Sequence, residues 1–413
     1  MIYPLYRKTE LPGGLRVVTE SIPHVRSVAV GVWLTVGSRD ENVQNNGISH
    51  FLEHMLFKGT RNRNTQQIAE SLEAVGGSLD AFTTKELTCY SAHVLDEHLP
   101  LSIEVLSDLI INSTLDELEI EKEKEVILKE IAYYKDTPDD LIFDHFYENI
   151  FCPHPLSYEI YGNEGNIRQF DRNQLLSFKE EQYASNRSVI SVAGNISHEE
   201  IVALVQENFA GLEGSKSRSV VNISQTRGQE RVYSASCSQV HVCFGTRAYA
   251  YEDERKFPFL ILHTMLGGGM SSILFQKIRE DLGLAYSIYS FYDFFIDSGI
   301  FGIYFSTDQQ HIDRILDLVK HEIGRIKREK ISQDTLEKMK NQLKGNLLLG
   351  LESTVARMNR LARNEIYLDR YYTLDEVIGK IDEVTLDDVS RVANDLFKEE
   401  HYFTTILKSR NTK

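Results

Sequence analysis

The chain has 413 residues, which exceeds one ordinary hydrophobic core and predicts two or more domains. Hydrophobic residues make up 42% and charged residues 26% of the sequence, as in a globular protein. The formal net charge of −16 argues against nucleic-acid binding, which usually requires a basic surface, but it is compatible with basic peptide partners or simply with solubility.

The N-terminus, "MIYPLYRKTELPGG", has no long apolar run after a basic start, so we expect no secretory signal peptide. No later segment approaches about 18 uninterrupted apolar residues, which predicts no membrane span. The four cysteines, Cys89, Cys152, Cys237 and Cys243, form no C-x-x-C motif and indicate free thiols. Together these features predict a cytoplasmic protein with reduced cysteines.

The first half of the chain groups its predicted strands and helices in blocks. Valine-rich, alternating segments predict strands at 15–20 and 25–38. Further elements are a strand pair at 78–95, a strand at 187–194, and helices at 47–58, 64–75, 97–111, 115–135, 173–184 and 197–209. Ser197, with Glu200 three residues later, predicts a capping box at the start of the last helix.

The second half repeats this order. Its predicted elements are strands at 239–246 and 401–408, a strand pair at 284–307, helices at 253–265, 270–281 and 308–323, a long helix from about 332, and a helix at 385–398. The polar, Gly- and Ser-rich segment between the halves predicts a linker at 213–230. We therefore expect an α+β fold of two homologous domains, 1–212 and 231–413, each with a mainly antiparallel sheet packed with helices.

One short motif carries chemistry. In "GISHFLEHMLFKGT" (47–60), His50, Glu53 and His54 are three and four residues apart and share one helix face. Neutral imidazoles are good zinc ligands, and two at this spacing reach one ion. The alternative is a pair of core histidines satisfied by hydrogen bonds. Burying all three polar groups without compensation is costly, so the pattern favours a metal site.

A zinc site of this kind needs a third protein ligand from another helix. Within the predicted helix 115–135, Glu123 and Glu130 lie in the apolar part and occupy one stripe, seven residues apart. Periodicity alone does not choose between them. A charge-rich helix is also typical of a solvated face.

H-x-x-E-H is the inverted zinc-peptidase signature. The segment 47–60 resembles the pitrilysin (insulinase) family of metallopeptidases, in particular its short branch, which is similar to the mitochondrial processing peptidase beta subunit and its bacterial homologues. The segments 76–88 and 266–290 match two further family signatures, so the resemblance covers nearly the whole chain. It implies one Zn²⁺ per chain, with His50, His54 and Glu130 as ligands and Glu123 in support.

The resemblance and the residue types assign the same role to Glu53. Zinc activates water and polarises a carbonyl, and a carboxylate beside that water takes its proton and passes it to the leaving amine. The expected function is a bacterial zinc endopeptidase that cuts short or unfolded, preferably basic, peptides.

Two other segments are implied in substrate binding. In the family the strand that includes Asp80, Ala81, Phe82 and Thr83 pairs with an extended peptide, although an ordinary sheet strand fits the same residues. The family commonly has Asn where this chain has Asp80.

Arg279 and Tyr286, seven residues apart, match a family pair that holds the substrate backbone and the developing oxyanion. Without the resemblance they are a helix-surface arginine and a packed tyrosine. The preceding glycines, 267–269, predict a flexible turn, although in the processing peptidase a glycine-rich loop helps to recognise substrate. Ile273 replaces a frequent family arginine.

The second half lacks the metal set, because Phe259 and Leu262 stand where His50 and Glu53 would be and only His263 matches His54. Longer family members carry four such domains, so we expect a homodimer with a composite active site that combines zinc from one chain with Arg279 and Tyr286 from the other. The alternative is a non-catalytic partner subunit of a processing-peptidase-like assembly. A more distant alternative, an oxidoreductase, is set aside because no G-x-G-x-x-G follows a strand.

Overall fold

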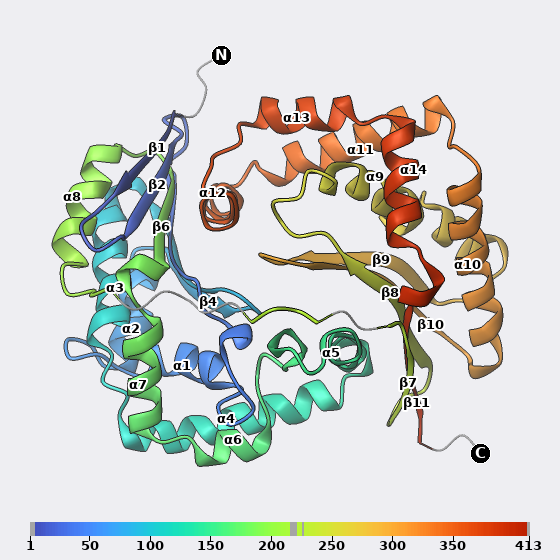
Figure 1. Ribbon diagram of the computed structural model, residues 1–413. Helices are drawn as coiled ribbons and strands as arrows, with labels where there is room; N and C mark the ends of the chain where they lie inside the picture. Colours follow the sequence, from blue (N-terminus) through green and yellow to red (C-terminus); the bar gives the residue numbers. More distant parts are fainter. Residues whose placement is uncertain (1–4, 215–220, 225–226, 411–413) are drawn as a thin grey trace. The chain divides into compact units, whose positions relative to one another are not determined.

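The computed structural model describes residues 5–214, 221–224 and 227–410, and these form two compact units (Figure 1). The first unit contains the described residues within 1–131, 158–220 and 350–371, and the second contains the remainder. Part of the predicted linker, 213–230, lies outside the described residues. None of the helices in the described ranges is long and apolar enough to cross a membrane.

The first unit is built on a six-stranded sheet with the order β1-β2-β6-β3-β5-β4. Its strands are β1 (Leu5–Glu10), β2 (Arg16–Ser21), β3 (Ser27–Leu34), β4 (Ser78–Thr83), β5 (Thr88–Leu95) and β6 (Ser188–Gly194). Neighbouring strands are antiparallel except β2 and β6, which are parallel. The prediction of a mainly antiparallel sheet is confirmed, with one parallel pair in addition. Strand β4 is an edge strand of this sheet.

Helices cover both faces of the first sheet (Figure 1). Helices α3 (Leu99–Asn112) and α8 (His198–Asn208) pack on one face, and α12 (Thr354–Leu368) packs on the other, across β2, β3 and β6. The contact with α12 centres on Trp33, whose indole N–H donates to Ser191 Oγ at 3.0 Å and lies 3.4 Å from Met358 Sδ. This unit also contains α1 (Ile48–Leu56), α2 (Thr65–Glu73), α6 (Glu164–Gln169), α7 (Arg172–Gln182) and most of α4 (Glu117–Lys135).

The second unit repeats this plan with a five-stranded sheet in the order β7-β11-β8-β10-β9. Its strands are β7 (Glu230–Ala235), β8 (Val240–Ala248), β9 (Ser287–Phe294), β10 (Gly299–Thr307) and β11 (Phe403–Ser409), and only β7 and β11 are parallel. Helix α5 (Pro138–Phe151) packs on one face through Ile142 and Phe146. The core on the other face involves α9 (Lys256–Gly267), α10 (Ile312–Arg328) and α14 (Leu386–Leu396).

Each unit therefore includes a helix that comes from the other half of the sequence. Helix α5 lies in the first half of the chain but covers the second sheet, and α12 lies in the second half but covers the first sheet. The predicted boundaries, 1–212 and 231–413, miss this exchange of residues 132–157 and 350–371. Apolar periodicity identifies an amphipathic helix, but it does not say which sheet that helix covers.

Three further details differ from the sequence prediction. The long helix expected from about 332 is α11 (Gln333–Gly350), and α12 and α13 (Leu374–Glu383) follow it as separate helices that were not predicted. Strands β1 and β7 and helices α5 and α6 were not predicted either. Ser197 is the N-cap of α8 but forms no side-chain cap, because its hydroxyl donates to Glu199 at 3.3 Å, so the predicted capping box is wrong.

Candidate active site

Helix α1 begins at a position that only glycine suits. Gly47, its N-cap, has φ = 100°, and a Cβ there would lie 2.8 Å from Gly162 Cα. The buried carboxylate of Glu41 accepts hydrogen bonds from the backbone N–H groups of Gly47 and Ser49, both at 2.8 Å. A remote side chain thus satisfies two orphan donors of the helix and fixes where α1 starts.

The structure brings His50, His54 and Glu130 together at one point. Their ligand atoms all lie within 4.8 Å of one another. His50 Nε2 is 3.7 Å from one Glu130 oxygen, and His54 Nε2 is 3.6 Å from the other. The side chains of His50 and Glu130 are 12% and 29% exposed, so the cluster is partly accessible to solvent. Two imidazoles and a carboxylate from separate helices make a donor set that suits zinc.

Glu123 supports this cluster rather than joining it. Its carboxylate is 3% exposed and accepts the hydrogen bond of His54 Nδ1–H at 2.8 Å. Its second oxygen pairs with Lys58 Nζ at 2.7 Å. Because a carboxylate can only accept, this bond selects the His54 tautomer that keeps a lone pair on Nε2.

The histidines differ in their protonation. Burial, reinforced by the neighbouring His54, lowers the pKa of His50 to about 3, so this imidazole is neutral and able to ligate a metal. Burial opposes a charge on His54 as well, but the Glu123 hydrogen bond and the charges of Glu130 and Glu53 outweigh it and raise the pKa of His54. His50 Nδ1 is buried and has no hydrogen-bond partner among the described residues.

Glu53 lies between the two histidines in α1, and its partner is Thr83. The Thr83 hydroxyl, at the end of β4, donates a hydrogen bond to the Glu53 carboxylate. Burial raises the pKa of Glu53, and the Thr83 bond offsets only part of this effect. The two histidines of the cluster and a partly buried carboxylate with a raised pKa therefore share helix α1.

The expected substrate strand is β4. It pairs only with β5 among the described strands, so one edge has no strand neighbour. Asp80 is exposed, whereas Ala81, Phe82 and Thr83 are partly exposed. All four residues are on this edge strand next to α1, but the Thr83 side chain already forms a hydrogen bond with Glu53.

Arg279 and Tyr286 lie together in the second unit. Arg279 is part of a π-helical segment, Phe275–Asp281, and its guanidinium lies 5.9 Å from the centre of the Tyr286 ring. Tyr286 is 74% exposed. Of the glycines just before them, Gly267 is explained by packing, because a Cβ there would lie 2.3 Å from Ser290 N.

The second unit holds no counterpart of the metal cluster within its described residues. His263 in α9, the match of His54, bonds instead through Nδ1 to the Ser290 hydroxyl at 2.8 Å. Burial lowers the pKa of His263 to about 4. This histidine is a neutral core residue with a hydrogen-bond partner.

Sequence reasoning missed Lys58 and Glu41. Lys58 follows His54 by four residues and lies in the turn just past the end of α1, and this spacing from the motif is a signal that could have been used. Glu41 caps α1 from outside the helix, through a loop whose course no periodic pattern reveals.

Comparisons with known proteins agree with this geometry. Residues 16–164 match the family model described as insulinase (peptidase family M16), and residues 169–343 match the model described as peptidase M16 inactive domain. The chain is 40% identical over 398 residues to uncharacterized zinc protease YmxG of Bacillus subtilis, covering 96% of this chain and 97% of that protein. It is 39% identical to uncharacterized zinc protease Rv2782c of Mycobacterium tuberculosis, covering 98% and 94%.

Two solved structures have the same fold. A protease from Helicobacter pylori superposes with a TM-score of 0.91 at 22% identity, covering 98% of this chain and all of that one. A structure described as a peptidase M16 inactive domain, from Pseudomonas fluorescens, superposes with a TM-score of 0.92 at 18% identity, covering 99% of each chain.

Proposed function

Because this chain belongs to the insulinase family of peptidases, M16, it is a zinc metalloprotease, and we propose that it is an endopeptidase with its active site on α1 and α4. The observation that carries the proposal is the convergence of the ligand atoms of His50, His54 and Glu130 within 4.8 Å, on and beside the helix that carries the partly buried Glu53. A purely structural histidine pair would not require the carboxylates of both Glu123 and Glu130 next to it.

The donor set fits zinc. His50 is neutral, the Glu123 bond holds His54 with Nε2 available, and Glu130 contributes one carboxylate. When bound, zinc supplies Lewis acidity, which lowers the pKa of water and polarises the scissile carbonyl. The protein supplies ligand orientation through the bonds to Glu123 and Lys58.

Glu53 is the general base. It follows His50 by three residues and precedes His54 by one, so its carboxylate faces the same side of α1 as the ligands. Burial raises its basicity, and the Thr83 hydroxyl holds one oxygen in place. Glu53 takes a proton from the attacking water and delivers it to the leaving amine.

The substrate is an extended peptide that adds to the free edge of β4. Backbone groups of Asp80, Ala81 and Phe82 provide hydrogen bonds independent of sequence, which suits short or unfolded substrates. The net charge of −16 and the exposed Asp80 favour basic peptides by long-range attraction. Thr83 contributes chiefly through Glu53, which modifies its expected role as a substrate contact.

The active form is a homodimer with composite sites. One chain supplies the metal cluster, and the other supplies Arg279 and Tyr286 to hold the substrate backbone and the developing oxyanion. In support, Tyr286 is 74% exposed and stands beside the half-exposed guanidinium of Arg279, so both donors are accessible to a substrate.

The peptidase proposal is tested with a peptide library, with and without a chelator, and the cut sites are identified by mass spectrometry. Glu53→Gln should keep zinc and lose turnover by about a thousandfold, because the amide cannot accept the proton. His50→Ala should lose zinc as well. Near-normal turnover of Glu53→Gln would refute the base assignment, and zinc binding without any cleavage by the unmodified chain would favour the non-catalytic partner subunit.

The composite site has its own test. Chains with His50→Ala and chains with Arg279→Ala, each inactive alone, are mixed and allowed to exchange subunits. The mixed dimer has one site with an intact metal cluster and an intact partner arginine, so activity should recover. No recovery despite proven exchange, or full activity of a strict monomer, would refute the shared site.

A further inference from the structure

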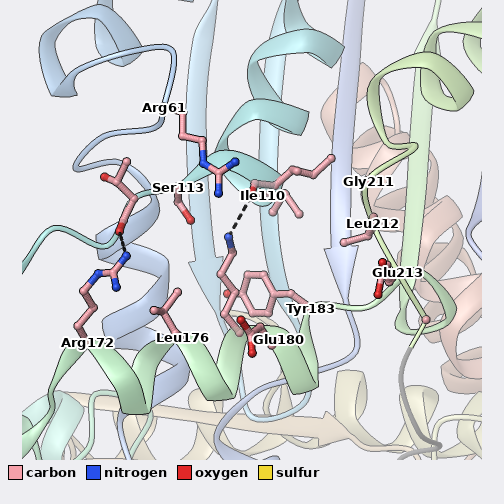
Figure 2. A pocket seen from close by; sticks show the side chains of 14 residues that line it. Arg61, Ile110, Ser113, Arg172, Leu176, Glu180, Tyr183, Gly211, Leu212 and Glu213 are labelled. Carbon is pink, nitrogen blue, oxygen red and sulfur yellow. Dashed lines mark hydrogen bonds between the residues drawn. The ribbon is translucent and has the colours of Figure 1, made fainter.

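A pocket of about 570 Å³ lies in the first unit, separate from the metal cluster. Figure 2 shows its walls, which come from α7, from residues 110–114 at the end of α3, from Arg61, and from residues 211–214. This volume is in the usual range for small-molecule sites. No step of the proposed peptidase mechanism uses these residues.

The charged groups around the pocket are mainly basic. Arg61, Arg172 and Lys179 line it, against the carboxylates of Glu180 and Glu213, so three positive and two negative charges leave a local charge of +1. The chain as a whole carries −16. The sign of the charge in this pocket is thus opposite to that of the whole chain. A positively charged pocket attracts anions.

The basic groups are only partly satisfied. Within the described residues, Arg61 has no side-chain hydrogen bond or ion pair, and Lys179 Nζ reaches only the carbonyl of Ile111, at 3.4 Å. Arg172 uses Nε and Nη2 on the carbonyls of Leu115 and Thr114, both at 3.1 Å, which fixes its guanidinium and leaves Nη1 unpaired. The buried Ser113 Oγ also has no partner there. Several donors in the pocket therefore have no partner within the described protein residues and are available to a bound anion.

The positive charges of Lys179 and Arg61 repel each other. Burial, together with the nearby charge of Arg61, lowers the pKa of Lys179 to about 8, and Glu180 offsets only part of this effect. An anion between the Lys179 ammonium and the Arg61 guanidinium would relieve the repulsion and replace lost hydration.

Part of the pocket wall is apolar. Ile110, Leu176, Leu212 and the Tyr183 ring lie among the charged groups (Figure 2). The Tyr183 hydroxyl is taken by Tyr90 at 2.9 Å, so the ring offers mainly a hydrophobic surface. An inorganic anion alone would leave this surface wet, whereas a ligand with a compact apolar body would cover it.

We propose that this pocket binds a small molecule that joins a phosphate monoester to a compact apolar or aromatic body. A phosphate monoester carries close to two negative charges at neutral pH and has three acceptor oxygens, so it can accept from more than one of these cationic donors. A carboxylate has one charge and two oxygens and satisfies fewer of these donors. The proposal is independent of the peptidase function.

The test is isothermal titration calorimetry on the full chain with phenyl phosphate, inorganic phosphate, benzoate and phenol. Phenyl phosphate should bind once per chain, about tenfold tighter than inorganic phosphate or benzoate, and phenol should not bind measurably. Repeating the titration after chelation excludes phosphate on the metal, so binding should survive chelator. Absence of saturable binding up to about 10 mM, equal affinity for benzoate, or loss with chelator would each overturn the proposal.

Two variants locate the site. Arg61→Gln is an exposed change that should not affect folding, and it should weaken phenyl phosphate about tenfold, as should Lys179→Gln. Arg168→Gln, an exposed arginine on α6 outside the pocket, is the matched control and should bind like the unmodified chain. Thermal melts of all variants separate lost binding from lost folding. Unchanged affinity in folded Arg61→Gln protein would place the ligand elsewhere.

Discussion

The Nδ1–H group of His54 donates a 2.8 Å hydrogen bond to Glu123, and the second oxygen of that carboxylate pairs with Lys58 at 2.7 Å. These two bonds lie on the Nδ1 side of the imidazole. The other ring nitrogen, Nε2, faces the metal cluster and is 3.6 Å from Glu130. Orientation of a metal-ligating histidine by a second carboxylate is part of how a site holds its ion.

Replacing Glu123 should therefore weaken zinc binding without removing a ligand. Glu123→Gln removes the charge that holds the His54 proton, and we expect the zinc dissociation constant to rise about 10- to 100-fold. Competition with a chromophoric chelator measures it. Glu125→Gln, at a 68% exposed carboxylate on the same helix, is the control and should leave the constant unchanged. Equal affinity in both variants would remove Glu123 from the site.

Thr83 should affect turnover more than substrate binding. Thr83→Val keeps the shape of the side chain but removes the hydroxyl that holds Glu53, so kcat should fall by about tenfold while KM changes little. Thr83→Ser retains the hydroxyl and should restore most of the rate. A rise in KM with unchanged kcat would instead make Thr83 a substrate contact.

The start of α1 should tolerate no side chain at Gly47. In Gly47→Ala the new methyl would meet Gly162 Cα at 2.8 Å, and the residue would keep φ = 100°. We expect a loss of about 1–3 kcal/mol in the free energy of unfolding, together with weaker zinc binding. Gly379, inside α13 with nothing within 4 Å, is the contrast, since Gly379→Ala should stabilise by up to about 1 kcal/mol. Urea titrations would show whether the two changes have opposite signs.

The loop after α1 should show acid-dependent stability through Asp108. This carboxylate is 3% exposed and accepts hydrogen bonds from Thr60 at 2.7 Å, Asn62 at 2.6 Å and Arg63 at 2.9 Å. Burial opposes its charge, but these bonds and that from Asn112 outweigh burial and lower the pKa of Asp108. Its stabilising contribution is therefore complete above the unfolded pKa of about 3.9 and is lost as pH falls through the lower folded value.

Asp108→Asn tests this sign. At neutral pH the variant should lose about 2 kcal/mol of unfolding free energy, and the difference from the unmodified chain should shrink below about pH 4. Denaturation in chelator, at both pH values, keeps metal release out of the comparison. Glu104→Gln, which removes a half-exposed partner of Arg63, should cost less than about 1 kcal/mol. A difference that grows on acidification would contradict the argument.

Local pattern was enough to predict most elements and the helix-borne part of the candidate site. The spacing of His50, Glu53 and His54 defines a shared helix face whatever the rest of the fold does, which is why these residues could be predicted. Glu123 and Glu130 share one stripe of α4, so periodicity could not separate ligand from support. Only the structure shows that Glu123 reaches Nδ1 and Glu130 reaches Nε2.

What sequence pattern missed depends on contacts that hydrophobic periodicity does not encode. Glu41 caps a helix it does not belong to, and Ser197 prefers Glu199 to the cap that its spacing suggested. Strands β1 and β7 are short, polar and at sheet edges, where the alternation of buried and exposed residues is weakest.

The exchange of α12 has a consequence for how the chain emerges from the ribosome. Trp33 is made early, but its cover, Met358, comes 325 residues later. At a synthesis rate of about 5–20 residues per second, the apolar face of the first sheet stays uncovered for roughly 15 to 65 s before α12 is made. During that interval the nascent protein exposes a surface that chaperones bind and aggregation exploits. The first unit therefore cannot complete its fold until residues 350–371, near the end of the chain, have been translated.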